Sequence, residues 1–157
     1  MKVLISGPSG SGKTSLCKVM QGFDLDNIGY WPSGRPYHGK YLIHMDKLKK
    51  ADPYLAFGIA NNINEVSKLF EIKLWIKINR RTLKRRLYKR WAEHPAHDGA
   101  HHILQSKKNQ TLLPPDEGWV YIDGNGTIPE IVKEIRWHVR HPTVVLSSND
   151  PLRRYHE

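Results

Sequence analysis

A glycine-rich segment near the amino terminus has the residue types and the spacing that bind phosphate groups. Residues 7–14 read Gly-Pro-Ser-Gly-Ser-Gly-Lys-Thr and fit the pattern G-x-x-x-x-G-K-[ST]. Because glycine lacks a Cβ atom, the backbone can curl with its N–H groups pointing at an anion, and a following helix adds the positive end of its dipole. Lys13 can then reach the β- and γ-phosphates of ATP, and the Thr14 hydroxyl can hold Mg²⁺. The residues expected to bind ATP here are Gly7, Pro8, Ser9, Gly10, Ser11, Gly12, Lys13, Thr14 and Ser15, with Lys13 also catalytic.

Two aspartates follow shortly after this segment. Residues 23–26 alternate as a short strand, which puts Asp24 and Asp26 on one face. Asp26 lies further along the strand, so we expect it nearer the phosphates, where a carboxylate can accept the proton of an acceptor hydroxyl or position Mg²⁺. Asp26 is therefore the expected catalytic carboxylate. The alternative is a pair of solvated carboxylates in a turn.

A run of cations fills residues 77–90, which contain eight lysines and arginines and no acid. On a helix over 81–93, Arg86 and Arg90 lie one turn apart and face the same way, as do Arg81 and Arg85. Guanidinium groups so placed can clamp a transferring phosphoryl group and neutralise its charge. We expect Arg86 to be catalytic and both Arg86 and Arg90 to contact ATP. A solvated helix face is the alternative, and it accounts for part of the run.

A second glycine-containing turn, residues 121–126, joins the last predicted strand to the last predicted helix. A Gly-rich loop at that place lets backbone groups approach an adenine, and Asn125 is the expected contact. Asn-Gly is also a common turn sequence, so the signal is weaker than that of residues 7–14.

The segments that must position these residues alternate between strand and helix. Apolar or alternating runs predict strands over 2–6, 23–26, 54–59, 72–78 and 119–122. Amphipathic runs and breakers predict helices over 12–21, 40–50, 61–69, 81–93, 98–108 and 128–138. This alternation predicts an α/β fold, with a parallel sheet, helices on both faces and the active site at the carboxyl ends of the strands.

The bulk composition fits one domain of 157 residues. We expect a single domain over 1–141, with a lid at about 79–95, and a polar tail over 142–157. No apolar run approaches the roughly 20 residues of a membrane span, and the glycine-rich segment begins too close to Met1 for a signal peptide. A cytoplasmic protein without membrane contact is expected, and its single cysteine, Cys17, is expected to be buried.

The charge is the unusual bulk feature, because 25 lysines and arginines face 15 acids, for a net charge of +10. Such an excess favours a polyanionic partner, nucleic acid first, over a basic surface that only maintains solubility. A local group of histidines, 94, 97, 101 and 102, includes one pair at helical i, i+4 spacing. No Glu or Cys completes a familiar zinc pattern, so phosphate contact or simple exposure is the preferred interpretation.

Some signatures of nucleotide hydrolases are missing. No Asp-Glu pair ends an apolar strand, since the strand near residue 59 has no acid and Gly124 follows Asp123. The base-reading pattern Asn-Lys-x-Asp is also absent. These absences favour transfer to a bound acceptor over hydrolysis.

Together these features resemble the small nucleoside- and nucleotide-kinase-like branch of P-loop proteins, over most of residues 1–140. Residues 86–90 resemble the lid of that branch, 123–126 match its adenine-side loop in position, and 23–26 resemble the strand with its catalytic carboxylate. The resemblance implies a three-layer P-loop fold with a five-stranded parallel sheet in the order 2-3-1-4-5. The acceptor region, 29–50, matches no nucleoside monophosphate kinase pattern, and the lid is short and has no cysteines.

The compact size is similar to that of bacteriophage kinases that phosphorylate 5-hydroxymethyluracil within DNA during hypermodification. The positive charge favours a polymer as the acceptor, and aromatic side chains would help to hold a flipped base. The aromatic residues expected around the acceptor are Tyr30, Trp31, Tyr37 and Trp91. Three alternatives stay open: a kinase of a free nucleoside or nucleotide, a polynucleotide 5′-hydroxyl kinase, and a nucleotide-dependent DNA-binding ATPase switch.

Overall fold

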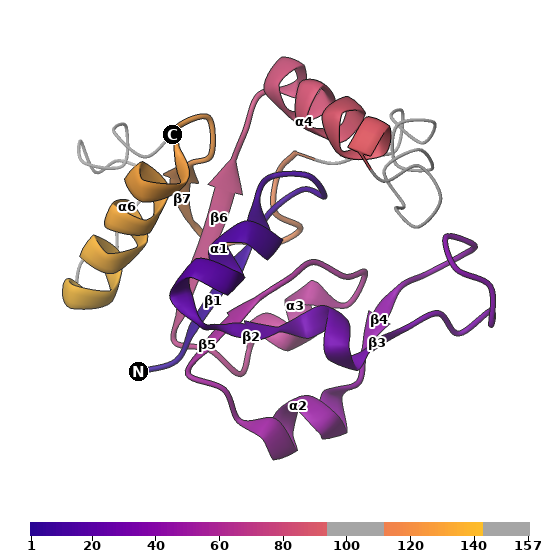
Figure 1. Cartoon of the computed structure of the whole chain (residues 1–157). Coiled ribbons are helices and arrows are strands. Elements are labelled where there is room, and N and C mark those ends of the chain that lie inside the picture. Colours follow the sequence, from indigo (N-terminus) through magenta and orange to yellow (C-terminus); the bar gives the residue numbers. More distant parts are fainter. Residues whose placement is uncertain (94–111, 143–157) are drawn as a thin grey trace.

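Five short parallel strands form the central sheet of this computed structural model, which describes residues 1–93 and 112–142 (Figure 1). They are β1 (Val3–Ser6), β2 (Phe23–Asp24), β5 (Leu55–Phe57), β6 (Ile72–Lys77) and β7 (Val120–Asp123). Their order across the sheet is β2-β5-β1-β6-β7. In chain order this is 2-3-1-4-5, so the predicted α/β fold and sheet are confirmed. The predicted helix over 98–108, the four histidines and residues 143–157 of the tail lie outside the described residues.

The central position of β1 explains its apolar sequence. It pairs with β5 on one side, where Val3 lies opposite Leu55, and with β6 on the other, where Ser6 lies opposite Trp75. All four residues of β1 are buried, because helices cover both faces of the sheet. The loop that follows β1 therefore starts from the central, fully buried strand of the sheet.

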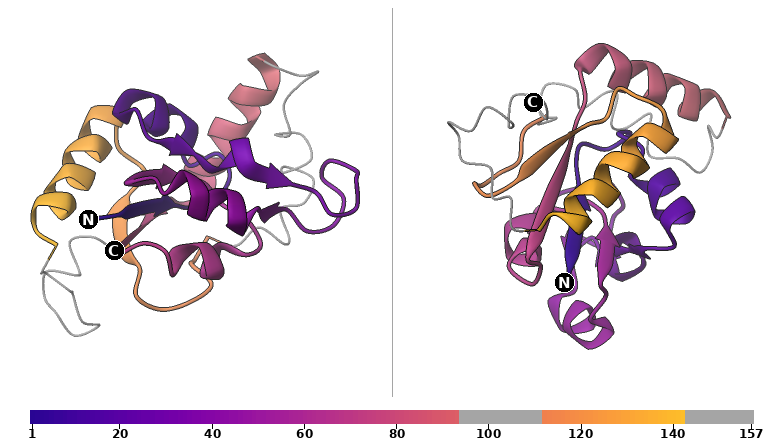
Figure 2. Two further views of the ribbon diagram at one scale, coloured as in Figure 1. Left: turned by 90° about the horizontal axis from the view of Figure 1, so that it is seen from below. Right: turned by 90° about the vertical axis from the view of Figure 1, so that its left-hand side faces the viewer.

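Helices cover both faces of the sheet (Figures 1 and 2). On one face α1 (Lys13–Met20) and α6 (Ile128–Arg140) pack on a core that includes Ile5, Ile76 and the buried Cys17. On the other face α2 (Met45–Ala51) and α3 (Ile63–Ser67) pack on a core that contains Leu4, Ala56 and Trp75. Among the described residues, no helix combines the length and the hydropathy of a membrane span.

Helix α4 (Arg80–Glu93) stands apart from both layers and lies over the carboxyl end of β6 (Figure 1). Its two buried leucines, Leu83 and Leu87, pack with Ile78 in a small separate core. Asn79 caps it, because the Asn79 side chain accepts a hydrogen bond of 2.8 Å from the N–H of Thr82. The predicted helix over 81–93 thus begins one residue earlier.

The segment predicted as a helix over 40–50 is helical only from Met45. Before it, β4 (Leu42–Ile43) pairs antiparallel with β3 (Gly29–Tyr30) in a hairpin. The Asn62 side chain accepts from the N–H of Ile43 and donates to its carbonyl, both at 3.0 Å. These distant partners satisfy backbone groups that a helix would have used, so the helical prediction was wrong for residues 40–44.

The strand predicted over 23–26 is also shorter than expected. It ends at Asp24, and a 3₁₀ turn, η1 (Leu25–Ile28), follows. The Asp24 carboxylate accepts a hydrogen bond of 2.9 Å from the N–H of Asp26, which turns the chain out of the extended conformation. Asp24 and Asp26 therefore do not share one face of a strand, contrary to the prediction.

Candidate active site

The glycine-rich loop, residues 7–14, joins β1 to α1 at the carboxyl edge of the sheet. Gly10 and Gly12 adopt the left-handed region, with φ of 86° and 101°, which glycine enters without strain. Gly12 is the N-cap of α1 and offers no side-chain cap, and the first turn contains no acid. The first-turn N–H groups of α1 thus face outward with the positive end of the helix dipole, which suits a phosphate group.

Lys13 folds back over this loop. Its Nζ donates hydrogen bonds of 2.7 Å to the carbonyls of Gly7 and Pro8. Burial lowers the pKa of Lys13 to about 7, with the carboxylate of Asp26 opposing that shift and the guanidinium of Arg90 adding to it. The groups that affect the pKa of Lys13 thus come from α4, which carries Arg90, and from the segment of Asp24 and Asp26. A bound polyphosphate would compensate the burial of the charge.

This lowered pKa predicts that ATP binding takes up a proton. Above about pH 7 the unliganded Lys13 is mostly neutral, whereas phosphate oxygens favour its charged form. ATP affinity should therefore fall as pH rises above 7, by up to about tenfold per pH unit. Calorimetry at about pH 8, in buffers of different ionisation enthalpy, should show an uptake approaching one proton per ATP. In Lys13→Arg, whose guanidinium stays charged, the uptake should vanish; equal uptake in both proteins would contradict the assignment.

The loop touches α4 without a gap at Gly10. A Cβ atom at Gly10 would lie 2.8 Å from Cδ2 of Leu87 and 3.2 Å from Cδ1 of Leu83. Both leucines are buried, so neither has room to retreat. Glycine at this position is thus required by the helix above it as well as by the backbone conformation.

Gly10→Ala should consequently lower the free energy of unfolding by about 2–4 kcal/mol, since left-handed strain and overpacking add. Gly34→Ala is the matched control, because Gly34 has φ of 76° but no atom within 4 Å of the added methyl group. The control should lose only about 1 kcal/mol. Urea denaturation of both variants measures the difference, and equal losses would mean that the contact with α4 has no energetic weight.

Arg86 links the two loops that were predicted to flank ATP. Its Nη1 donates to the Ser11 carbonyl at 3.2 Å and its Nη2 to the Gly126 carbonyl at 3.4 Å. Burial lowers the pKa of Arg86, with the neighbouring Arg85 adding to the effect. The structure therefore places Arg86 beside the glycine-rich loop, and in this state it bonds carbonyl groups of both loops. Arg90, the other expected ATP contact, is near enough to affect the pKa of Lys13.

Asn125 has a bonding role inside the second loop. Its side chain donates to Oδ1 of Asp123 at 3.1 Å and accepts from the N–H of Asn79 at 3.2 Å. These bonds tie the loop after β7 to the start of α4. The Asn125 side chain therefore has partners within the protein, and its role as a contact of ATP stays a prediction.

Asp26 lies in η1, two residues after the end of β2. Its carboxylate is exposed and accepts a hydrogen bond of 2.8 Å from the Tyr41 hydroxyl. Burial raises the pKa of Tyr41, and the hydrogen bond to Asp26 adds to the rise, so the phenol keeps its proton and holds the carboxylate in place. Tyr41 was not among the predicted site residues, because its spacing with Met45 and Leu48 indicated the buried face of a helix.

Aromatic side chains from the hairpin extend this side of the site. The Trp31 ring lies 4.9 Å from Tyr41 and 5.3 Å from Tyr37, centroid to centroid. A Cβ at Gly29 would coincide with the Tyr41 hydroxyl, so Tyr41 fills the space above Gly29. Two of the predicted aromatic residues, Trp31 and Tyr37, are thus joined to Asp26 through Tyr41.

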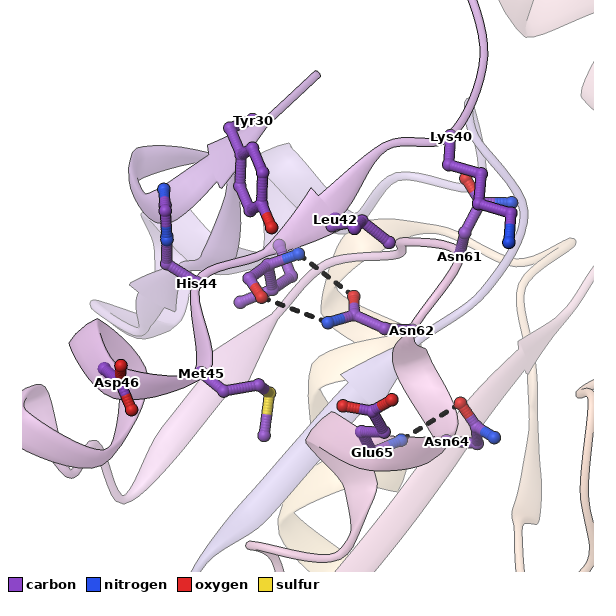
Figure 3. Close-up of a pocket in the computed structure, with 11 residues that line it drawn as sticks. Tyr30, Lys40, Leu42, His44, Met45, Asp46, Asn61, Asn62, Asn64 and Glu65 are labelled. Atoms are coloured by element: carbon purple, nitrogen blue, oxygen red, sulfur yellow. Dashed lines mark hydrogen bonds between the residues drawn. The ribbon is translucent and has the colours of Figure 1, made fainter. Parts of the chain in front are cut away.

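The other two predicted aromatic residues lie elsewhere. Trp91 packs against the small core beneath α4. Tyr30 stacks on His44, with centroids 4.0 Å apart, on the hairpin face opposite Tyr41. There Tyr30 lines a cavity of about 580 Å³ between the hairpin and α3. Figure 3 shows this cavity and the two hydrogen bonds between the Asn62 side chain and the backbone of Ile43. Its charged lining residues are Lys40, Asp46 and Glu65, which do not form a phosphate site.

A Mg²⁺ ion would have one predicted protein ligand, the Thr14 hydroxyl. Thr14 is exposed in the first turn of α1, beside the anion-binding N–H groups, so the hydroxyl fits an ion held mainly by phosphate oxygens and water. No group of three His, Cys, Asp or Glu side chains within residues 1–93 and 112–142 could hold a metal on its own.

Comparisons with known proteins support the fold. No family model and no curated protein matches the chain. A solved structure described as an unliganded sugar kinase from Janibacter sp. HTCC2649 matches with a TM-score of 0.55 and 18% sequence identity. The match covers 93% of this chain and 98% of that chain. The chain thus has a kinase-like α/β fold, and at this identity the likeness defines the fold alone.

Proposed function

We propose that the protein is an ATP- and Mg²⁺-dependent kinase that transfers the γ-phosphoryl group of ATP to a hydroxyl. One observation carries the proposal: two cations meet at the glycine-rich loop, where Lys13 donates to the Gly7 and Pro8 carbonyls at 2.7 Å and Arg86 to the Ser11 carbonyl at 3.2 Å. The carboxylate of Asp26 and the guanidinium of Arg90 are near enough to affect the pKa of Lys13, which supports roles for both in the same reaction. The kinase-like fold supports the same class of reaction.

In this proposal each residue of the site has its own role in the phosphoryl transfer. The acceptor oxygen attacks the γ-phosphorus, the bond to the β–γ bridging oxygen breaks, and ADP leaves. Asp26 takes the proton of the acceptor hydroxyl, while the Tyr41 hydroxyl holds the carboxylate at 2.8 Å. Lys13 and Arg90 stabilise charge on the transferring group, and Arg86 joins them after exchanging its carbonyl partners for phosphate oxygens. Bound Mg²⁺ would neutralise charge on the phosphate oxygens.

The favoured acceptor is 5-hydroxymethyluracil in DNA. Between Asp26 and Asp46 the chain contains no carboxylate, so the hairpin beside the site does not repel a polyanion. Trp31 and Tyr37 form an aromatic pair next to Tyr41, where a base can stack. The alternatives are a free nucleoside or nucleotide and a polynucleotide 5′-hydroxyl end, and from another class a DNA-binding ATPase switch. Because the solved structure with a similar fold is described as a sugar kinase, a free sugar is a further alternative acceptor.

The test is a transfer assay with γ-labelled ATP and Mg²⁺ against separate acceptors: nucleosides, a set of sugars, plain duplex DNA, single-stranded DNA with a 5′-hydroxyl, and duplex DNA with 5-hydroxymethyluracil. We expect label only in the last of these. Label in a nucleoside, a sugar or a 5′ end would replace the acceptor and keep the kinase. Released phosphate without any labelled acceptor would overturn the kinase itself.

A further inference from the structure

Helix α4 carries most of the excess charge of the protein. Its residues 80–93 include seven lysines and arginines and one glutamate. Helix α6, of similar length, carries Lys133, Arg136 and Arg140 but also two glutamates. The charge of α4 is therefore a local feature of one helix.

The cations of α4 divide between two faces. The buried leucines fix the inner face, and Arg86 points from its flank to the loop carbonyls. Four cations lie on the outer surface, where each is exposed: Arg81, Lys84, Arg85 and Lys89. No ion pair within the described residues involves any of these four side chains. Phosphoryl transfer, which uses the inner flank, leaves this outer surface without a role.

We infer that this surface, Arg81, Lys84, Arg85 and Lys89, binds the sugar–phosphate backbone of a nucleic acid. From Arg81 to Lys89 the helix rises about 12 Å, which equals three to four nucleotide steps along one strand. Each phosphate neutralised by a cation releases counterions and adds affinity. The inference deepens the proposed function and rests on it for the choice of DNA as the polymer.

The position of α4 suits this role. The helix lies over the carboxyl edge of the sheet, above the glycine-rich loop (Figure 1). The carboxylate-free hairpin approaches Asp26 from another direction, through Tyr41. A backbone held on α4 is thus anchored close to the point of transfer. An anionic membrane fits less well, because the apolar face of α4 is buried in the protein and cannot enter lipid.

The test is oligonucleotide binding by the quadruple variant R81Q/K84Q/R85Q/K89Q, measured by fluorescence anisotropy. The probe is plain DNA of about 20 nucleotides, duplex and single-stranded, between roughly 50 and 200 mM KCl. The variant should bind at least about 30-fold more weakly at the lowest salt, and its log K should fall about three units less steeply with log salt. The pairs R81Q/R85Q and K84Q/K89Q should each give an intermediate loss.

The matched control is K133Q/R136Q/R140Q, which removes exposed cations from α6 and should stay within about threefold of the parent. Unchanged binding in the quadruple variant, or an equal loss in the control, would overturn the inference. So would binding to phosphatidylcholine vesicles containing phosphatidylserine with none to DNA. The assay contains neither ATP nor a hydroxymethylated base, so failure of the kinase assay leaves its result unaffected.

Discussion

Lys13→Met should reduce phosphoryl transfer by about 10³-fold in kcat, because it removes the cation that meets charge developing on the transferred group. The Lys13 ammonium group is held by the carbonyls of Gly7 and Pro8, so it is already positioned above the loop before a nucleotide binds. Steady-state transfer to the acceptor identified above measures the effect. ATP binding should weaken as well, since the same group is the centre of the phosphate site.

The control for this variant lies on the same helix. Lys18 is exposed on α1 and forms part of its last turn, away from the loop. Lys18→Met removes the same charge and should keep kcat within about twofold. If both variants lost activity equally, the effect would come from overall charge or from helix stability, and the role given to Lys13 would be lost.

Asp26→Asn should lower kcat by about 10²- to 10⁴-fold while changing the ATP dissociation constant by no more than about threefold. Asparagine keeps the size of the side chain and can still accept the Tyr41 hydrogen bond, but it cannot take a proton from the acceptor. Transfer kinetics and nucleotide titration on the same preparation separate the two effects.

Asp24→Asn is the matched variant, because asparagine can replace the carboxylate that caps η1 at the N–H of Asp26. It should keep kcat within about fivefold of the parent, since Asp24 acts through the turn and not on the acceptor. Full transfer in Asp26→Asn, or a larger loss in Asp24→Asn, would remove Asp26 as the base.

The parallel sheet could be predicted because strand and helix signals alternate along the chain, whereas its order, 2-3-1-4-5, followed from the resemblance to small P-loop kinases. The ends of elements depended on partners far away in the chain. Tyr41, Met45 and Leu48 have helical spacing, but Asn61 and Asn62 bind the backbone of Tyr41 and Ile43 and draw the first part into a hairpin. Periodicity does not reveal such a clamp across about 20 residues.

The site could be predicted to the same extent: its local motif was found, but its contacts between distant residues were not. The glycine-rich loop is local, so its pattern predicted its position after β1 and before α1. The alternation of residues 23–26 matched a strand, but a single side-chain bond from Asp24 outweighed it. Tyr41 reaches Asp26 across 15 residues. No pattern within the segment distinguishes this phenol from a core residue, and only the folded hairpin brings the two together.

The contact between Gly10 and Leu87 connects the proposed ATP site with the helix that carries the proposed nucleic-acid surface. Leu87 belongs to the helix whose outer surface we assign to a nucleic acid, and Gly10 belongs to the loop we assign to ATP. Because the loop and the helix are in direct contact, we expect a shift of the loop on nucleotide binding to move the helix as well. If it does, ATP and DNA form a linked pair of ligands: each changes the affinity of the other by the same factor, and occupancy of one site reports on the other.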